Sequence, residues 1–200
     1  MAKVYNYTYG LDVWLTTRKS LQLRAEIDER TAAGDLSASS PIPYQVARCM
    51  PYLQAVIKEG LRLEGSPGIP LPRVVPQCGA EIAGHFFPGG TVVGVNAYVL
   101  HRNKDIFGHD AEDFNPDRWL GDKEVVSRSL PLLNNEQFGG GSRVCIGKHI
   151  AFIELSTLIP DLVRKFDFEL VDPCAQRKRR NVFFIKHQNL DVKISERRAC

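Results

Sequence analysis

One cysteine of this chain stands in a glycine-rich stretch whose residue types could hold a metal ion. Residues 138–147 read Phe-Gly-Gly-Gly-Ser-Arg-Val-Cys-Ile-Gly, and an apolar pattern with helical spacing follows them. Three successive glycines let the backbone approach a flat or bulky ligand, because they carry no Cβ atom. Cys145 is expected at the N-terminus of the following helix, where free N–H groups and the helix dipole favour a thiolate over a thiol. The pattern indicates a metal-binding thiolate, with a buried structural thiol as the alternative.

A carboxylate and a guanidinium group form a second pattern with possible chemistry. Pro51 suits the first turn of a helix that we expect to end near Leu63. Glu59 and Arg62 stand about one helical turn apart on it, so their side chains can touch. From the residue types alone, this is a surface ion pair that contributes about 0.3 kcal/mol.

The glycine-rich stretch resembles the haem-ligand signature of the cytochrome P450 superfamily. That signature is Phe-x-x-Gly-x-Arg-x-Cys-x-Gly, and residues 138–147 match it at every defined position. Ile150, Ala151 and Glu154 continue the resemblance into the next helix. The resemblance implies that Cys145, as a thiolate, is the axial ligand of the iron in haem b, which is iron protoporphyrin IX.

Five further residues match positions that bind haem in this family. Arg73 and Arg143 match partners of the haem propionates, a contact for which the planar guanidinium fork is well suited. Phe138 matches the residue that packs on the cysteine side of the porphyrin, and Gly141 and Gly147 are the defined glycines of the signature. For Arg73 an ordinary exposed arginine is the alternative.

The resemblance also changes the interpretation of the charged pair. Glu59-Gly-Leu-Arg62 falls where the family carries its Glu-x-x-Arg motif, and residues 114–119, Phe-Asn-Pro-Asp-Arg-Trp, resemble its Phe-x-Pro-x-Arg-Phe/Trp segment. The resemblance implies that Glu59 and Arg62 are buried behind the haem and that Arg118 completes a structural triad. Removing one partner of such a buried set typically costs about 3 to 5 kcal/mol.

The resemblance begins near residue 20 and covers the C-terminal, haem-binding portion of a P450 domain. We assign this portion to residues 20–200 and leave residues 1–19 unassigned. The expected fold class is α+β, mainly α-helical with small β-sheets. Residues 33–35, Ala-Gly-Asp, are similar to the start of the family's oxygen-activating helix, but the following Leu-Ser-Ala-Ser-Ser-Pro cannot continue a long helix. We therefore expect that helix to be absent from this chain.

The family reaction implies an oxidoreductase, a truncated haem-thiolate monooxygenase of secondary metabolism. Such an enzyme inserts one oxygen atom from dioxygen into a small-molecule organic substrate, and its electrons come from NADPH through a reductase. Two alternatives remain open. The chain could belong to a haem-thiolate isomerase or dehydratase that needs no oxygen activation, or it could be a non-catalytic remnant.

Spacing and turn chemistry predict the other elements. The predicted helices cover residues 20–30, residues 51–63 and the segment from Gly147 to Phe166, in which Pro160 should kink or shorten the helix. Residues 31–43 are expected to form a loop. A hairpin is predicted between residues 81–87 and 91–95, across the turn Pro88-Gly89-Gly90. Short strands are predicted over residues 168–172, 182–186 and 190–194.

Charge and cysteine content argue against several classes of protein. The net charge of +3 is too small to indicate a nucleic-acid partner, and the basic run at residues 177–180 is typical of a solvated loop. Five cysteines without a Cys-x-x-Cys pair fit neither a disulfide framework nor a tetrahedral zinc site, which favours a reducing interior. His101 is expected to be a hydrogen-bonded structural histidine, because a thiolate already supplies the proximal ligand.

The apolar residues are too dispersed to predict a membrane segment in this chain, since no run of about 18 of them occurs. Residues 1–10 carry no apolar h-region, so we do not expect a signal peptide. The expected location is intracellular, and at the endoplasmic-reticulum membrane if the full-length relative carries an anchor.

Overall fold

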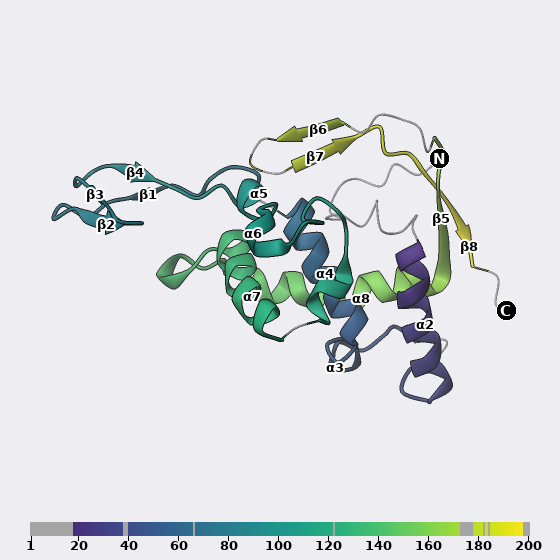
Figure 1. The fold of residues 1–200 in the computed structure, drawn as a ribbon. Coiled ribbons are helices and arrows are strands. Elements are labelled where there is room, and N and C mark those ends of the chain that lie inside the picture. Colours follow the sequence, from purple (N-terminus) through teal and green to yellow (C-terminus); the bar gives the residue numbers. More distant parts are fainter. Residues whose placement is uncertain are drawn as a thin grey trace.

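The protein combines a helical body with small antiparallel sheets at its margins (Figure 1). The computed structural model describes residues 18–37, 40–65, 67–121, 123–172, 178–181, 183 and 185–197. Its helices are α2 (Arg18–Ala32), α3 (Tyr44–Ala47), α4 (Pro51–Glu64), α5 (Ala97–Leu100), α6 (Lys104–Phe107), α7 (Lys123–Phe138) and α8 (Lys148–Lys165), with 3-10 helices η1 (Pro116–Trp119) and η2 (Gly141–Arg143). Its strands are β1 (Arg73–Val74), β2 (Ala80–Ile82), β3 (His85–Phe87), β4 (Val92–Val93), β5 (Phe166–Leu170), β6 (Lys178–Asn181), β7 (Ile185–Gln188) and β8 (Val192–Glu196). This arrangement confirms the predicted mixture of helices and small sheets.

Helix α4 lies at the centre of the helical body. Most of its 14 residues are buried, and these include the charged residues Glu59 and Arg62. A helix that is buried on nearly all sides lies inside a fold and not on its surface. Its apolar residues join one hydrophobic core with α2, α7 and α8, to which Leu23, Leu133 and Ile159 contribute. The helix predicted at residues 51–63 is thus confirmed, but its burial extends well beyond the one apolar stripe that the spacing indicates.

The N-terminus of α4 is held by a side chain from another helix. Met50 stands at the N-cap position and provides no side-chain hydrogen bond. The carboxylate of Glu26 on α2 instead accepts from the backbone N–H groups of Tyr52 at 2.9 Å and Leu53 at 3.0 Å. Two of the donors that a helix start leaves unpaired are satisfied in this way, and the negative charge faces the positive end of the helix dipole. Glu26 therefore fixes α2 against α4.

The predicted hairpin across Pro88-Gly89-Gly90 is wrong in its pairing. Strand β2 pairs with β3, with Ile82 opposite His85, so the tight turn falls at Ala83 and Gly84. Both turn residues have positive φ, 51° and 78°, as the two-residue turns that match strand twist require. The second pairing joins β1 to β4. Together these strands project from the helical body at the left of Figure 1.

Two of the three predicted C-terminal strands are present with shifted ends, since β5 and β8 overlap residues 168–172 and 190–194. Strand β5 pairs with β8, and β6 pairs with β7, both in antiparallel register. Because β6 ends at Asn181 and β7 begins at Ile185, the single strand predicted over residues 182–186 is wrong. The basic run at residues 177–180 was expected in a loop, yet its last three residues belong to β6. Paired strands take priority over residue type there, because the ladder satisfies the backbone groups.

Of the two long helices that remain, α8 was predicted and α7 was not. Helix α8 begins at Lys148 and continues for several residues past Pro160, so this proline does not shorten it. Helix α7 was not predicted, since Pro131 interrupts its pattern and its residues include few strongly periodic apolar positions.

The segment that follows α2 does not begin an oxygen-activating helix. Gly34 has φ of 81°, and the N–H of Asp35 donates to the carbonyl of Arg30. This left-handed glycine and the backward hydrogen bond are typical of a helix end. The Ala-Gly-Asp triplet therefore closes α2, as the context of the sequence predicts.

Among the described residues, no helix is both long and apolar enough to cross a membrane. The predictions made for residues 1–10 lie outside the described part of the chain, as does most of the unassigned segment 1–19. The assignment of residues 20–200 as one haem-binding portion stays a prediction.

Glu26→Ala should lower the free energy of unfolding by about 1 to 2 kcal/mol, because it leaves the start of α4 uncapped. Urea denaturation followed by circular dichroism measures this change. Glu29→Ala is the matched control, since Glu29 is an exposed residue of the same helix. Equal losses in the two variants would contradict the capping role.

Candidate functional site

The carboxylate of Glu59 is the centre of a buried hydrogen-bond cluster. Arg62 donates to both of its oxygens, from Nε at 2.9 Å and from Nη2 at 2.8 Å. Arg118 donates from Nε at 3.0 Å, and the backbone N–H of Asn115 donates at 2.8 Å. The indole N–H of Trp119 adds a fifth contact at 2.9 Å. Glu59 is fully buried, and only such complete pairing makes a buried carboxylate tolerable.

Arg62 connects this cluster to the chain segments that surround it. Its Nη1 donates to the backbone carbonyls of His101 at 2.5 Å and Ala111 at 2.6 Å. Its Nη2 donates in addition to the carbonyl of Asp113 at 3.1 Å. A guanidinium group offers five N–H donors in a planar fork, so one arginine side chain can bind several backbone carbonyls of a loop at the same time. The residues between α5 and η1 are therefore wrapped around Arg62.

The structure brings the three predicted triad members together and adds Trp119, which was not expected as a partner of Glu59. Arg118 lies in η1 and also pairs with Asp110 at 3.1 Å, besides donating to the carbonyl of Phe107. Burial acts to raise the pKa of Asp110, but hydrogen bonds from Asn115 and Arg118 outweigh it and lower this pKa. The signal for Trp119 was its position directly after Arg118, because η1 presents both residues to Glu59.

The cysteine loop is closed by a backbone hydrogen bond at its base. The N–H of Cys145 donates to the carbonyl of Phe138 at 2.6 Å. The ring of Phe138 packs against that of Phe152 on α8, with ring centroids 5.6 Å apart. The thiol of Cys145 is free and exposed, and neighbouring Ile146 is 97% exposed. The loop thus presents a thiol on a defined backbone while leaving one side open.

Two glycines of the loop have backbone conformations that other residues rarely adopt. Gly139 has φ of 73°, and a Cβ atom there would lie 2.9 Å from the carbonyl oxygen of Arg143. Gly141 has φ of 59°, and the space around it is open. Gly147 is different, because its φ of −81° is available to any residue. A Cβ atom there would make only an ordinary contact, at 3.7 Å from Sγ of Cys145, so the backbone at Gly147 does not by itself require a glycine.

Cys145 stands further from the helix start than the sequence suggests. Gly147 is the N-cap residue of α8, and the carbonyl of Cys145 accepts from the N–H of Lys148 at 3.3 Å. Cys145 therefore precedes the first turn instead of belonging to it.

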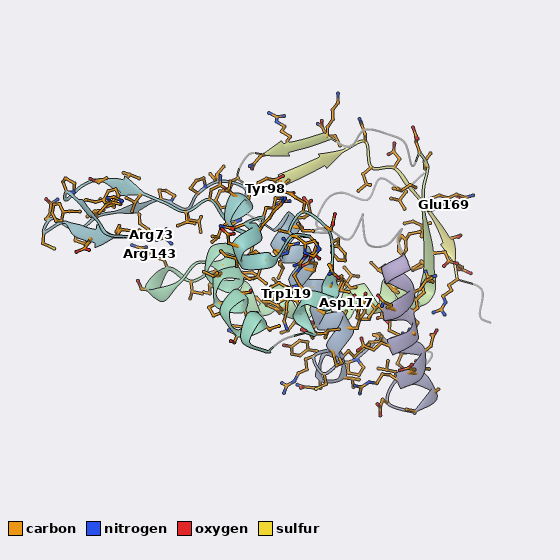
Figure 2. All side chains as sticks on the ribbon, viewed as in Figure 1. Arg73, Tyr98, Asp117, Trp119, Arg143 and Glu169 are labelled. Carbon is orange, nitrogen blue, oxygen red and sulfur yellow. The ribbon has the colours of Figure 1, made fainter. Side chains whose placement is uncertain are left out.

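Arg73 and Arg143, the two arginines predicted to bind propionates, are both exposed. Arg73 lies on β1 and donates from Nη1 to the carbonyl of Pro72 at 2.9 Å. Arg143 ends η2, within the cysteine loop. In the view of Figure 2 their labelled side chains lie next to each other, between the projecting strands and the loop. Two exposed arginines and one exposed thiol are a donor set whose chemistry fits a metal porphyrin with two carboxylates.

No group of three or more His, Cys, Asp or Glu side chains suited to a metal ion occurs among the described residues. A bare ion would need such a group to complete its coordination. Haem does not need one, because the porphyrin nitrogens occupy the other positions and a single axial thiolate suffices. A single thiol such as that of Cys145 is therefore compatible with haem.

His101 is a structural histidine, as expected. Its side chain is fully buried, and its Nδ1 lies 3.0 Å from Nε2 of Gln137. Burial lowers the pKa of His101 to about 4, and the positive charge of Arg62 adds to this effect. The second positive charge that acts on the ring is that of Arg102. The imidazole is consequently neutral in the folded protein at physiological pH.

The exposed thiol of the cysteine loop, the buried carboxylate with its two arginines and the mixed helical fold fit the class of haem-thiolate proteins. The family model described as "Cytochrome P450" matches residues 15–194. This chain belongs to the cytochrome P450 family.

Curated relatives and a solved structure agree with this assignment. The chain is 42% identical over 176 residues to "Cytochrome P450 monooxygenase gsfF" of Penicillium aethiopicum, covering 88% of this chain and 34% of that protein. It is 44% identical over 178 residues to "Pisatin demethylase" of Fusarium vanettenii, covering 89% and 32%. The crystal structure of a cytochrome P450, CYP102L1, has a TM-score of 0.77 at 26% identity, covering 93% of this chain and 40% of that one. The chain thus spans about a third of the length of the curated relatives.

Glu59→Ala should lower the free energy of unfolding by about 3 to 5 kcal/mol, because it leaves Arg62 and Arg118 buried without their carboxylate. The measurement is chemical denaturation of the purified chain. Glu112→Ala is the control, since the 66% exposed side chain of Glu112 pairs with Arg102 at 3.3 Å and should contribute less than about 1 kcal/mol. A Glu59→Ala variant as stable as Glu112→Ala would contradict this account of the cluster.

Stability should fall as the pH decreases from 6.5 to about 4, because the unfolded chain then binds a proton at residue 101 and the folded chain does not. Above pH 6.5 the contribution of neutral His101 to the free energy of unfolding is fully present, and about 3 kcal/mol is lost in total as the pH falls to about 4. Asp110 contributes in the same direction but only below its usual pKa of 3.8. The measurement is the free energy of unfolding against pH. His101→Leu should flatten the profile in this window, whereas His109→Leu, at an exposed histidine, should leave it unchanged.

Proposed function

We propose that this chain is the haem-binding part of a monooxygenase that inserts one oxygen atom from dioxygen into a small organic molecule of secondary metabolism. Haem, when bound, supplies the iron at which dioxygen is activated. NADPH provides the electrons through a reductase. Membership of the cytochrome P450 family supports the proposal, as do the monooxygenase names of similar proteins. An intracellular location, at the endoplasmic-reticulum membrane if the full-length relative carries an anchor, is part of the same proposal.

Each residue of the candidate site has a distinct task in this proposal. Cys145 would hold the iron as a thiolate, a type of ligand whose electron density favours O–O cleavage. Arg73 and Arg143 would pair with the two propionates through their guanidinium groups. Phe138 shields the thiolate side from water, and Gly141 keeps the loop free of a side chain there.

One observation carries the proposal above the others. Cys145 is an exposed thiol whose own N–H closes the loop at Phe138, so its backbone is held while its sulfur remains accessible. A structural thiol, the alternative considered for this residue, would be buried in an apolar environment. The exposure of Cys145 thus favours the ligand over the structural thiol.

Cys145→Ser should remove the thiolate signature of the haem-loaded chain, because an alcohol does not ionise near neutral pH and is a weaker ligand. The chain is titrated with haemin, reduced and exposed to carbon monoxide, and the difference spectrum is recorded. The unaltered chain should give the long-wavelength Soret band of a thiolate complex. Cys78→Ser is the matched control, since Cys78 is also a free exposed cysteine but lies outside the loop.

The same preparation separates the three functional classes. A chain without the thiolate band would be a non-catalytic remnant. A chain with the band that converts a substrate only with dioxygen, NADPH and a reductase would be a monooxygenase. Turnover that needs no electrons or dioxygen would instead identify an isomerase or dehydratase and overturn the proposal.

A further inference from the structure

Gln137 is the last residue before the cysteine loop and is anchored inside the protein. Its side chain is 6% exposed. Its Nε2 lies 3.0 Å from Nδ1 of His101, which is itself fully buried. A Cβ atom on Gly65, at the end of α4, would come within 2.0 Å of its Oε1, so the amide lies directly against that helix end.

His101 joins this amide to the buried charge cluster. The backbone carbonyl of His101 accepts from Nη1 of Arg62 at 2.5 Å, and its ring contacts Phe107 edge-on, with centroids 6.0 Å apart. An amide nitrogen can only donate, so Nδ1 accepts from Gln137 and the neutral ring carries its proton on Nε2. A continuous polar path therefore runs from Glu59 through Arg62 and His101 to Gln137.

The path ends at the backbone that holds the thiol. Phe138 follows Gln137 directly, and its carbonyl accepts from the N–H of Cys145 at 2.6 Å. The polypeptide turns sharply beyond this carbonyl, at Gly139, where φ is 73°. The position of the Phe138 carbonyl consequently sets the position of Cys145.

We propose that His101 and Gln137 are positioning residues, which hold the base of the cysteine loop against the Glu59–Arg62 cluster and so fix Cys145 relative to the helical body. They act through the backbone of the cysteine loop. The proposal deepens the proposed function but rests on contacts within this chain.

The two side chains are poorly explained as contributors to stability alone. His101 Nε2 and Gln137 Oε1 are buried atoms without a hydrogen-bond partner in the described part of the chain. The carbonyls of Arg62 and Leu132 lie near the imidazole, yet neither makes a hydrogen bond of ordinary geometry with Nε2. Unpaired buried polar atoms destabilise a fold, and an apolar pair of the same shape would avoid this. A polar pair with defined direction does, however, select one arrangement of the chain.

The test measures hydrogen exchange at the amide of Cys145 in the purified chain without haem. Gln137→Met keeps the length of the side chain but removes its hydrogen bond to His101. It should speed exchange at Cys145 about tenfold beyond any change in global unfolding. Gln54→Met is the matched control. Gln54 lies on α4, and this substitution removes its hydrogen bonds to the carbonyl of Ala47 and the hydroxyl of Ser156. It should change exchange at Cys145 only in proportion to global stability.

A second substitution tests whether His101 and Gln137 act through the hydrogen bond that they share. His101→Leu retains the carbonyl bound by Arg62 but removes the ring, so it should accelerate exchange as much as Gln137→Met does. The double variant should be no faster than either single variant, since both remove one shared contact. Additive effects, or effects that follow global stability alone, would overturn the proposal. If Gln137→Met does not fold, Gln137→Asn, whose amide is too short to reach His101, decides the same question.

A haem-loaded sample provides the spectroscopic readout. Gln137→Met should raise the fraction of the carbon monoxide complex that has lost thiolate ligation, and Gln54→Met should not. A chain that binds no haem would count against the proposed function only, because the exchange measurement still decides the positioning role.

Discussion

The rest of the structure depends on one buried carboxylate. Glu59 is inside the protein, where an unpaired charge would be prohibitively unfavourable, so five donors must converge on it. These donors come from α4, from the approach to η1 and from η1 itself, although the sequence separates them widely. The requirement to pair one charge therefore determines how the segment between α5 and η1 folds over the central helix.

The conformation of the cysteine loop depends in part on this arrangement. The loop itself contains glycines in left-handed conformations, which are permissive and add little rigidity. Its firm points are the packing of Phe138 on Phe152, the hydrogen bond that closes its base and the buried polar pair of His101 and Gln137. One of these neighbours, His101, is itself bound by Arg62 through its backbone carbonyl. Such support suits the role of axial ligand that we propose for Cys145, because coordination depends on geometry as well as on residue type.

Local chemistry predicted the main helices well but the strand pairing poorly. The proline at the start of α4 and the glycine after α2 act on adjacent backbone groups, so residues nearby in the sequence are enough to predict these helix ends. The hairpin was wrong because both Ala83-Gly84 and Pro88-Gly89-Gly90 can form turns, and only the pairing of β1 with β4 decides between them. Helix α7 was missed because its formation is decided by packing, with Leu133 in the core, and not by periodicity.

The sequence by itself determined the family and the identity of the candidate ligand, because the pattern from Phe138 to Gly147 is contained in one short stretch whose spacing needs no fold to be recognised. It could not determine whether Glu59 and Arg62 are a surface pair or a buried one, since two residues at this spacing look the same in either environment. Only the tertiary structure decided that, by placing Trp119, Asn115 and Arg118 around one carboxylate. The link from His101 to Gln137 is of the same kind, because contacts between distant residues follow from packing and leave no periodic trace in the chain.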